Sequence, residues 1–222
     1  MIPVHYPSEE TMYGELFEQQ VERLVECGWA AAAWKTRDDF RHWLAPLADL
    51  VCRVGKMDTD RIPFLIVVPH SVLSLEHQME RLVVEGKRGF IADEVASQLK
   101  NLHSIGEKPS PYLICGVDDG MTTVGQTSDA CLTILCSCGR RSGLTFEEGV
   151  ALATHHPQSL ADHDFALLGT QYGKKRGERD LCYLELWLSQ CGPTINHHWP
   201  ESRNERRGVP SCARRLTLRK EE

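Results

Sequence analysis

The feature that most constrains this chain is its longest apolar run, Ile62–Pro69, with the sequence IPFLIVVP. Most of its residues are β-branched or otherwise apolar, and a proline stands near each end. A short continuous run of this kind is typical of a strand that is covered on both faces. The run is far too short to cross a bilayer, because a spanning helix needs about 20 apolar residues. We therefore predict a buried central strand here, in which Phe64, Ile66 and Val68, or their neighbours on the other face, are buried.

Two segments with helical patterns precede this strand. The first begins after Ser8, a suitable N-cap, and ends at Gly28. Its apolar residues recur at helical spacing, namely Tyr13, Leu16, Phe17, Val21, Leu24 and Val25. The second begins at Thr36, which forms a capping-box-like pattern with Asp39. Residues 8–52 are therefore predicted to form a helical hairpin.

The segments after the run mix strand-like and helical patterns. PYLICGV and LCYLELWL are predicted strands, and LTFEEGVALATHHP is a predicted helix with a capping box between Thr145 and Glu148. Strict alternation of strand and helix is absent, which disfavours a doubly wound sheet. The predicted fold class is α+β, with the N-terminal helical hairpin packed on a mixed, mainly antiparallel sheet with intervening helices. We expect a single domain over residues 1–222, with 8–52 as the hairpin and 60–215 as the α+β core.

The charge balance disfavours two classes of partner. The chain has 31 acidic and 25 basic residues, which gives a formal net charge of −6. Nucleic-acid-binding domains are normally basic, so we predict no nucleic-acid partner, and the same balance disfavours an anionic membrane. The N-terminal MIPVHYPSEE lacks the basic and apolar regions of a signal peptide, which favours a cytoplasmic protein. Its nine cysteines form no CxxC pair and are expected to be free thiols.

Three stretches carry a resemblance, namely PYLICGVDDGMTTVGQTSDACLTIL, RRSGLTFEEGVALATHHPQSL and DFALLGTQYGKKR, of which LTFEEGVALATHHP is the most specific part. They resemble a family of uncharacterised bacterial proteins known only as a domain of unknown function, most strongly over residues 111–157. The earlier segments LFEQQVERLVECGW, IPFLIVVP and VEGKRGFIAD follow a similar order. One departure is that Tyr172 stands where family members tend to have a cysteine. The resemblance implies a shared fold unit and implies no activity.

The segment richest in side chains that could bind a ligand is Thr194–Arg215, TINHHWPESRNERRGVPSCARR. Arg203, Arg206 and Arg207 lie within five positions of one another. Guanidinium groups bind carboxylates and phosphates through paired hydrogen bonds, and Trp199 offers a flat apolar surface beside them. We therefore predict an anion-binding loop built from these four residues. The alternative is a solvated loop whose arginines pair with its own glutamates, Glu201 and Glu205, and bind nothing.

Two further hypotheses concern metal binding and catalysis. A Cys2His2 zinc site would use Cys191, His197, His198 and Cys212. These residues lack close chelating pairs, and adjacent residues of a strand point to opposite faces, so we predict no metal site. An enzyme would need His155 as a base beside Cys212 or Ser211 as a nucleophile, an arrangement to which the sequence gives no guide. The common hydrolase, nucleotide-binding and zinc-protease motifs are absent, and we predict no cofactor.

The sequence therefore favours a cytoplasmic binding or interaction protein with an anion-recognising C-terminal loop. Its partner would be a small anionic ligand or another protein, with no nucleic acid and no membrane. The alternative is a small hydrolase or transferase that uses a His/Cys or His/Ser pair.

Overall fold

The computed structural model describes residues 9–56, 60–92, 102–104, 110–172 and 182–218. The apolar run forms β1 (Ile62–Val67), and its residues from Phe64 to Val68 are buried, as predicted. β1 pairs antiparallel with β5 (Tyr112–Val117), which also pairs antiparallel with β12 (Arg214–Thr217). The predicted central position of the run is wrong. Within the described part of the chain, β5 is the middle strand of this three-stranded sheet and β1 lies at its edge.

A helix covers the open edge of β1 and accounts for the burial of an edge strand. Gln20 of α1 (Glu9–Glu26) donates a hydrogen bond from its side-chain amide to the Phe64 carbonyl, at 2.9 Å. Its side-chain oxygen accepts a hydrogen bond from the Ile66 backbone N–H, also at 2.9 Å. One side chain thus satisfies two backbone groups that a neighbouring strand would otherwise pair. An apolar strand can therefore lie at the edge without exposing its backbone.

The second sheet is mixed and mainly antiparallel, as predicted. Its described strands are β4 (Leu102–Ser104), β7 (Asp164–Tyr172), β8 (Cys182–Leu188), β9 (Pro193–His198) and β10 (Arg207–Gly208). β7 pairs antiparallel with β8 and β4, and β8 pairs antiparallel with β9. The short strand β10 joins β7 in parallel. Two small pairs complete the strands, β2 (Val83–Val84) with β3 (Lys87–Arg88) and β6 (Ser142–Gly143) with β11 (Ser211–Cys212).

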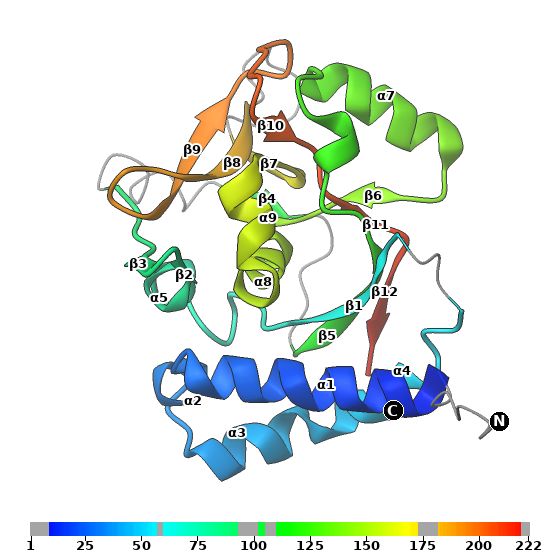
Figure 1. Cartoon of the computed structure of the whole chain (residues 1–222), viewed down its shortest axis with the longest axis vertical. Coiled ribbons are helices and arrows are strands. Elements are labelled where there is room, and N and C mark those ends of the chain that lie inside the picture. Colours follow the sequence, from blue (N-terminus) through cyan, green and yellow to red (C-terminus); the bar gives the residue numbers. More distant parts are fainter. Residues whose placement is uncertain (1–8, 57–59, 93–101, 105–109, 173–181, 219–222) are drawn as a thin grey trace, which may run out of the picture.

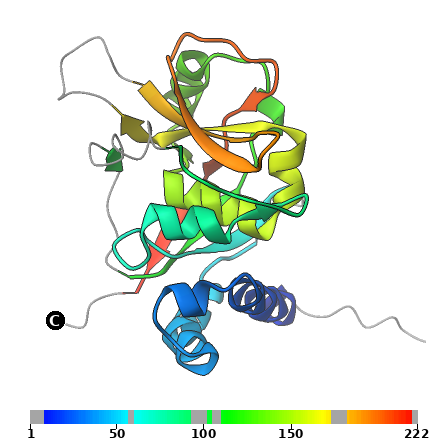
Figure 2. The same ribbon diagram turned by 90° about the vertical axis from the view of Figure 1, so that its left-hand side faces the viewer.

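The helix α8 (Phe146–His155) lies between the two sheets (Figures 1 and 2) and contacts β1, β7 and β8. Its residues from Phe146 to Thr154 are all buried. The predicted capping box is present, because Thr145 accepts from the Glu148 N–H and Glu148 accepts from the Thr145 N–H at 2.8 Å. The other described helices of this region are α5 (Leu75–Arg81), η3 (Met121–Thr123), α7 (Ser128–Cys138) and α9 (Pro157–Asp162).

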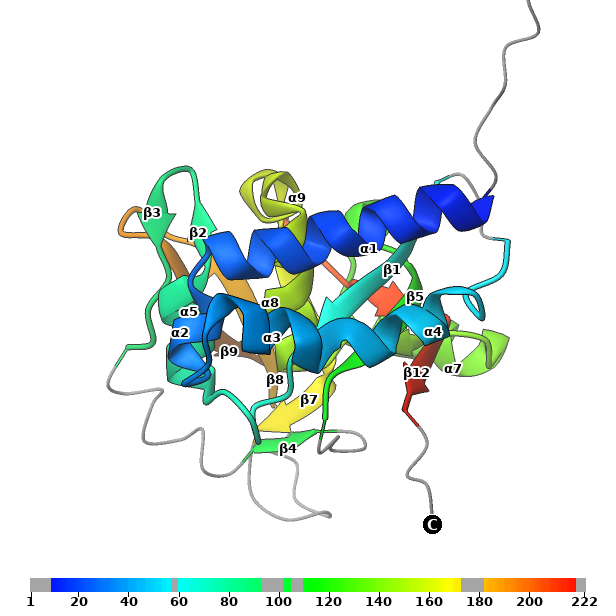
Figure 3. The same ribbon diagram turned by 90° about the horizontal axis from the view of Figure 1, so that it is seen from below.

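The N-terminal helices form a layer along one side of the molecule, below β1 and β5 in Figure 1 and nearest the viewer in Figure 3. After α1 come α2 (Trp29–Ala32), α3 (Arg37–Leu44), η1 (Ala45–Leu47) and α4 (Ala48–Val51). The predicted hairpin is therefore present, with its second arm divided where Pro46 enters η1. Thr36 caps α3 by accepting from the Asp39 N–H at 3.1 Å, whereas Ser8 lies outside the described residues. One hydrophobic cluster joins this layer to both sheets through residues such as Phe17, Phe64 and Phe165.

Candidate functional site

The predicted anion-binding residues lie on the loop between β9 and β10, residues 199–206, which we call the C-terminal loop. It lies at the end of the molecule opposite the N-terminal helices (Figure 1). The loop folds on itself, because the Ser202 N–H and hydroxyl both donate to the Trp199 carbonyl, at 3.0 and 2.8 Å. Farther along, the Asn204 side-chain oxygen accepts from the Arg206 N–H at 2.9 Å. These short-range hydrogen bonds define the backbone conformation of the loop.

Arg207, the residue that follows the loop, is buried and bound to a glutamate of the sheet. Its Nε and Nη2 atoms donate to the two carboxylate oxygens of Glu185 on β8, at 2.8 and 2.9 Å. The side chains of Arg207 and Glu185 are only 7% and 6% exposed. The third nitrogen, Nη1, donates to the Ser202 carbonyl and hydroxyl, at 3.1 and 2.9 Å. Arg207 therefore ties the loop to the sheet, and its guanidinium is occupied by partners within the chain.

Arg206 lies at the surface above a second carboxylate. Its side chain is 56% exposed, with Nε 3.8 Å from Asp164 at the start of β7 and Nη2 donating to the Ala161 carbonyl at 3.0 Å. The Asn204 amide donates to both Asp164 and Glu185, at 3.2 Å each. Burial, and then the neighbouring Glu185 carboxylate, raise the pKa of Asp164. The base of the loop is thus a network of two carboxylates, two arginines and one amide.

The surface of the loop carries the remaining predicted residues. Trp199 is 46% exposed, and Arg203 is exposed beside the exposed Glu201 and Glu205. Arg206 and Arg207 therefore contact partners that the sequence analysis did not name. Arg206 donates to Ala161 of α9 and lies near Asp164 of β7, and Arg207 binds Glu185 of β8. A signal for one partner exists in CYLELWL, where Glu185 is the only charged residue of an apolar strand and is 5% exposed. A charge in such a position needs a counterion, which Arg207 supplies.

The four residues of the hypothetical zinc site are dispersed. His198 is buried, and its Nε2 lies 2.7 Å from the Ser128 hydroxyl, whereas His197 is exposed on the other face of β9. Burial lowers the pKa of His198 to about 3, with a smaller contribution from Arg207, so its ring is neutral near pH 7. Cys191 is exposed and Cys212 is buried. Across the described ranges, no group of three or more His, Cys, Asp or Glu side chains is placed to hold a metal ion.

The two residues of the alternative His/Cys pair lie near opposite ends of α8. Cys212 lies near Glu148 in the first turn of the helix, and burial, then the Glu148 charge, raise the pKa of its thiol to about 11. His155 is the last residue of the same helix, which places its backbone about 10 Å farther along the axis. Burial lowers the pKa of His155 to about 3. Ser211, the other candidate nucleophile, accepts from Arg141 Nε at 3.0 Å.

A different histidine, His70, which the sequence analysis did not name, is paired with a buried carboxylate. His70 follows β1, and its Nδ1 lies 2.5 Å from Glu147 Oε1, which also accepts from the His70 N–H at 3.1 Å. Glu147 is 7% exposed and is further held by the Thr145 hydroxyl, at 3.0 Å from its second oxygen. The His70 side chain is 36% exposed. A buried carboxylate therefore orients a partly exposed imidazole.

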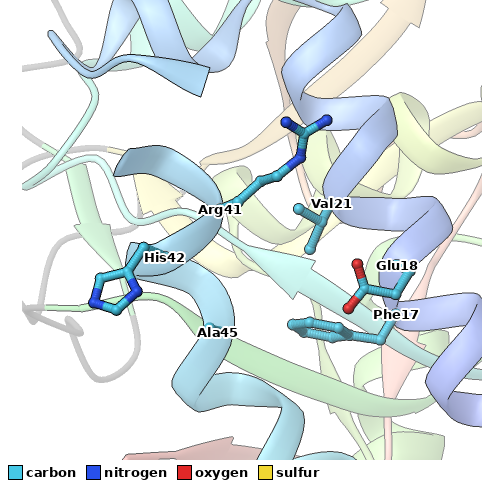
Figure 4. A pocket seen from close by; sticks show the side chains of 6 residues that line it. All are labelled: Phe17, Glu18, Val21, Arg41, His42 and Ala45. Atoms are coloured by element: carbon cyan, nitrogen blue, oxygen red, sulfur yellow. The ribbon is translucent and has the colours of Figure 1, made fainter. Parts of the chain in front are cut away.

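A shallow pocket of about 300 Å³ lies between α1 and α3 (Figure 4). Phe17 and Val21 form its apolar floor, and the Glu18 carboxylate projects from α1 toward α3. His42 points away from these groups in the same view, and Arg41 makes its ion pair with Glu22 instead. The polar side chains around this pocket therefore do not converge on a common point, as they do in most ligand sites.

Comparison with known proteins places the chain in a family. The model of a family of unknown function (DUF5701) matches residues 23–218, which include every described strand, α8 and the C-terminal loop. Neither the curated proteins nor the solved structures gave a match. In the described part of the chain, no helix is long and apolar enough to cross a membrane. The order of segments noted in the sequence and the match over residues 23–218 lead to one conclusion: this chain belongs to the family of unknown function DUF5701.

Proposed function

We propose that this protein binds a small anionic ligand, or a carboxylate or phosphate group of a partner protein, with its C-terminal loop. The observation that carries the proposal is the attachment of the loop. Arg207 and Asn204 fix the backbone to Glu185 and Asp164, and Trp199, Arg203 and Arg206 remain at the surface. A loop that is already ordered loses little conformational entropy when a ligand binds, which favours affinity.

Within this proposal, the predicted residues have two different roles. Arg207 is buried against Glu185, so we assign it the role of support and assign recognition to Arg203 and Arg206, with Trp199 as the stacking surface. Two exposed guanidiniums can each form charge-assisted hydrogen bonds with one phosphate or dicarboxylate. Glu201 and Glu205 flank these arginines, and they would favour a ligand that also carries a hydrogen-bond donor.

Thermal unfolding with a panel of anions tests this proposal. We expect phosphate or a dicarboxylate to raise the melting temperature at constant ionic strength, because a ligand that binds only the folded state stabilises it. Arg203→Ala combined with Arg206→Ala should abolish this rise. Arg53→Ala, which removes an exposed arginine near the N-terminal helices, is the matched control and should keep it. An equal rise in the wild type and the double variant would show that the loop is not the site.

A hydrolase or transferase is a second candidate, and the His70–Glu147 pair favours it. A carboxylate at Nδ1 fixes the tautomer of an imidazole and leaves Nε2 able to accept a proton. A screen of generic ester, thioester and phosphoester substrates tests this candidate. Any turnover should be lost in His70→Gln and kept in His77→Gln, the control histidine on α5. Activity that persists in His70→Gln would exclude His70 as the base.

A further inference from the structure

Trp34, between α2 and α3, combines two unfavourable properties. Its side chain is 91% exposed, so a large aromatic surface faces water. Its backbone has φ 57°, in the left-handed region that non-glycine residues rarely adopt. Neither property contributes to the stability of the folded chain. Outliers of this kind are a reason to look for a role in binding.

The backbone around Trp34 explains why the left-handed conformation is required. The Trp34 N–H donates to the Ala31 carbonyl at 3.1 Å, and the Lys35 N–H donates to the Ala30 carbonyl at 3.0 Å. These two bonds form the Schellman motif that ends α2, with Trp34 at the position where glycine is normally found. The fold would accept glycine here without strain, so the tryptophan is not explained by helix termination.

A pocket of about 300 Å³ lies next to this helix end, between α2 and the α5–β3 region. Ala31 and Val83 contribute apolar surface, and four charged side chains surround it, namely Glu26, Glu80, Arg81 and Arg88. This volume is at the lower limit of pockets that hold a small-molecule ligand. It is suited to one large side chain. Ala31 lines the pocket and its carbonyl also accepts the Trp34 N–H, so the backbone of the exposed tryptophan lies next to a residue of the pocket wall.

We propose that this surface binds a second copy of the chain, with Trp34 of each protomer inserted into the pocket of the other. A two-fold symmetric interface places each residue opposite a different residue of the same patch, so an anchor and its pocket must lie near each other on one face. The charges fit this arrangement, because two glutamates and two arginines around the pocket are complementary to a copy of themselves. The same balance gives no net attraction to an anionic lipid surface. This surface adjoins α2, far from the C-terminal loop, so the inference is independent of the proposed anion site.

Sedimentation of the full chain over a range of concentrations tests the proposal. We expect the wild type to form a dimer as its concentration rises. Trp34→Gly should weaken the dimer by about two to three orders of magnitude, because the exchange uses a hot-spot aromatic residue twice. The melting temperature of this variant, measured on the monomer, should be equal or higher. Trp199→Ala, which removes the exposed tryptophan of the C-terminal loop, is the control and should dimerise normally.

A complementation experiment distinguishes exchange of tryptophans from general adhesion. Ala31→Glu should block the pocket and give a second monomeric variant, whose Trp34 is intact. When the two variants are mixed, they should form heterodimers. The Trp34 of the Ala31→Glu chain can then enter the open pocket of the Trp34→Gly chain. A wild type that stays monomeric at all concentrations, a Trp34→Gly chain that still dimerises, or a mixture without heterodimers would each overturn the proposal. Trp34→Ala provides a second variant with the same expected loss of dimerisation.

Discussion

At the scale of single residues, His198 makes stability depend on pH. Its folded pKa of about 3 lies below the usual value of 6.5, so the unfolded chain binds the proton more readily between these two values. Stability is therefore complete above pH 6.5 and is lost as the pH falls toward 3. Between pH 7.5 and pH 5 the loss from this residue should be about 2 kcal/mol.

Urea unfolding at pH 7.5, 6.5 and 5 measures this dependence. His198→Gln cannot take up the proton, so its free energy of unfolding should fall less than that of the wild type between pH 6.5 and pH 5. The comparison uses the slope with pH, which is separate from any loss caused by the missing Ser128 contact. Equal slopes in the two proteins would mean that the pKa of His198 is the same in the folded and unfolded chains.

Whether an interaction could be predicted from the sequence depends on how far apart its two residues lie along the chain. The capping box of Thr145 and Glu148 follows from residues three positions apart, and it was predicted. Arg207 and Glu185 are 22 positions apart, and their pairing depends on how β10 and β8 meet around β7. Glu148 itself binds Arg215 across 67 positions, which no local pattern indicates. Local hydrogen bonds are therefore visible in the sequence, and tertiary ion pairs are not.

At the scale of elements, the attachment of the C-terminal loop depends on the buried pair of Arg207 and Glu185. Removal of one partner leaves the other charge buried, so Arg207→Ala or Glu185→Gln should each cost about 3–5 kcal/mol. Arg203→Ala, on the exposed part of the same loop, should change stability by less than about 0.5 kcal/mol. Chemical denaturation of the three variants measures these differences. A neutral Arg207→Ala would mean that the pair does not hold the loop.

The edge of β1 supports a second prediction at this scale. Gln20→Leu removes both hydrogen bonds to the strand and leaves the Phe64 carbonyl and Ile66 N–H buried without partners. Each of the two unsatisfied groups costs about 1–3 kcal/mol, so the variant should lose about 2–6 kcal/mol. Ile66→Ala should lose a similar amount through lost contacts and a cavity. Gln19→Leu, on the exposed side of the same helix, is the control for Gln20→Leu and should be nearly neutral.

The strand order explains why the sequence analysis predicted β1 to be a central strand when it is an edge strand. A continuous apolar run indicates burial on both faces, and Phe64 to Val68 are indeed buried. Burial on the faces does not determine whether a second strand lies at each edge. Here α1 takes that place at one edge, and it does so through the polar side chain of Gln20. A glutamine within an amphipathic helix gives no sign of such a role.

At the scale of the whole molecule, the shared hydrophobic cluster supports the expectation of one cooperative unit. The cluster contains residues of the N-terminal helices and of both sheets, and α8 is packed between the sheets. We propose that the chain unfolds in a single transition. Far-ultraviolet circular dichroism and fluorescence of the tryptophans should then give the same denaturation midpoint, as two-state unfolding requires. Two separate midpoints would show that the N-terminal helices unfold independently of the sheets.

The central claim is that the exposed arginines of the C-terminal loop recognise an anion, and calorimetric titration tests it most directly. Inorganic phosphate and a dicarboxylate are each titrated into the wild type, the variant with Arg203→Ala and Arg206→Ala, and the Arg53→Ala control. We predict that at least one anion binds the wild type and the control with equal affinity. Its affinity for the double variant should be at least about tenfold weaker, because each lost charge-assisted contact contributes about 1.5–3 kcal/mol. Equal affinity for the double variant and the wild type, or no binding of either anion by the wild type, would contradict the claim.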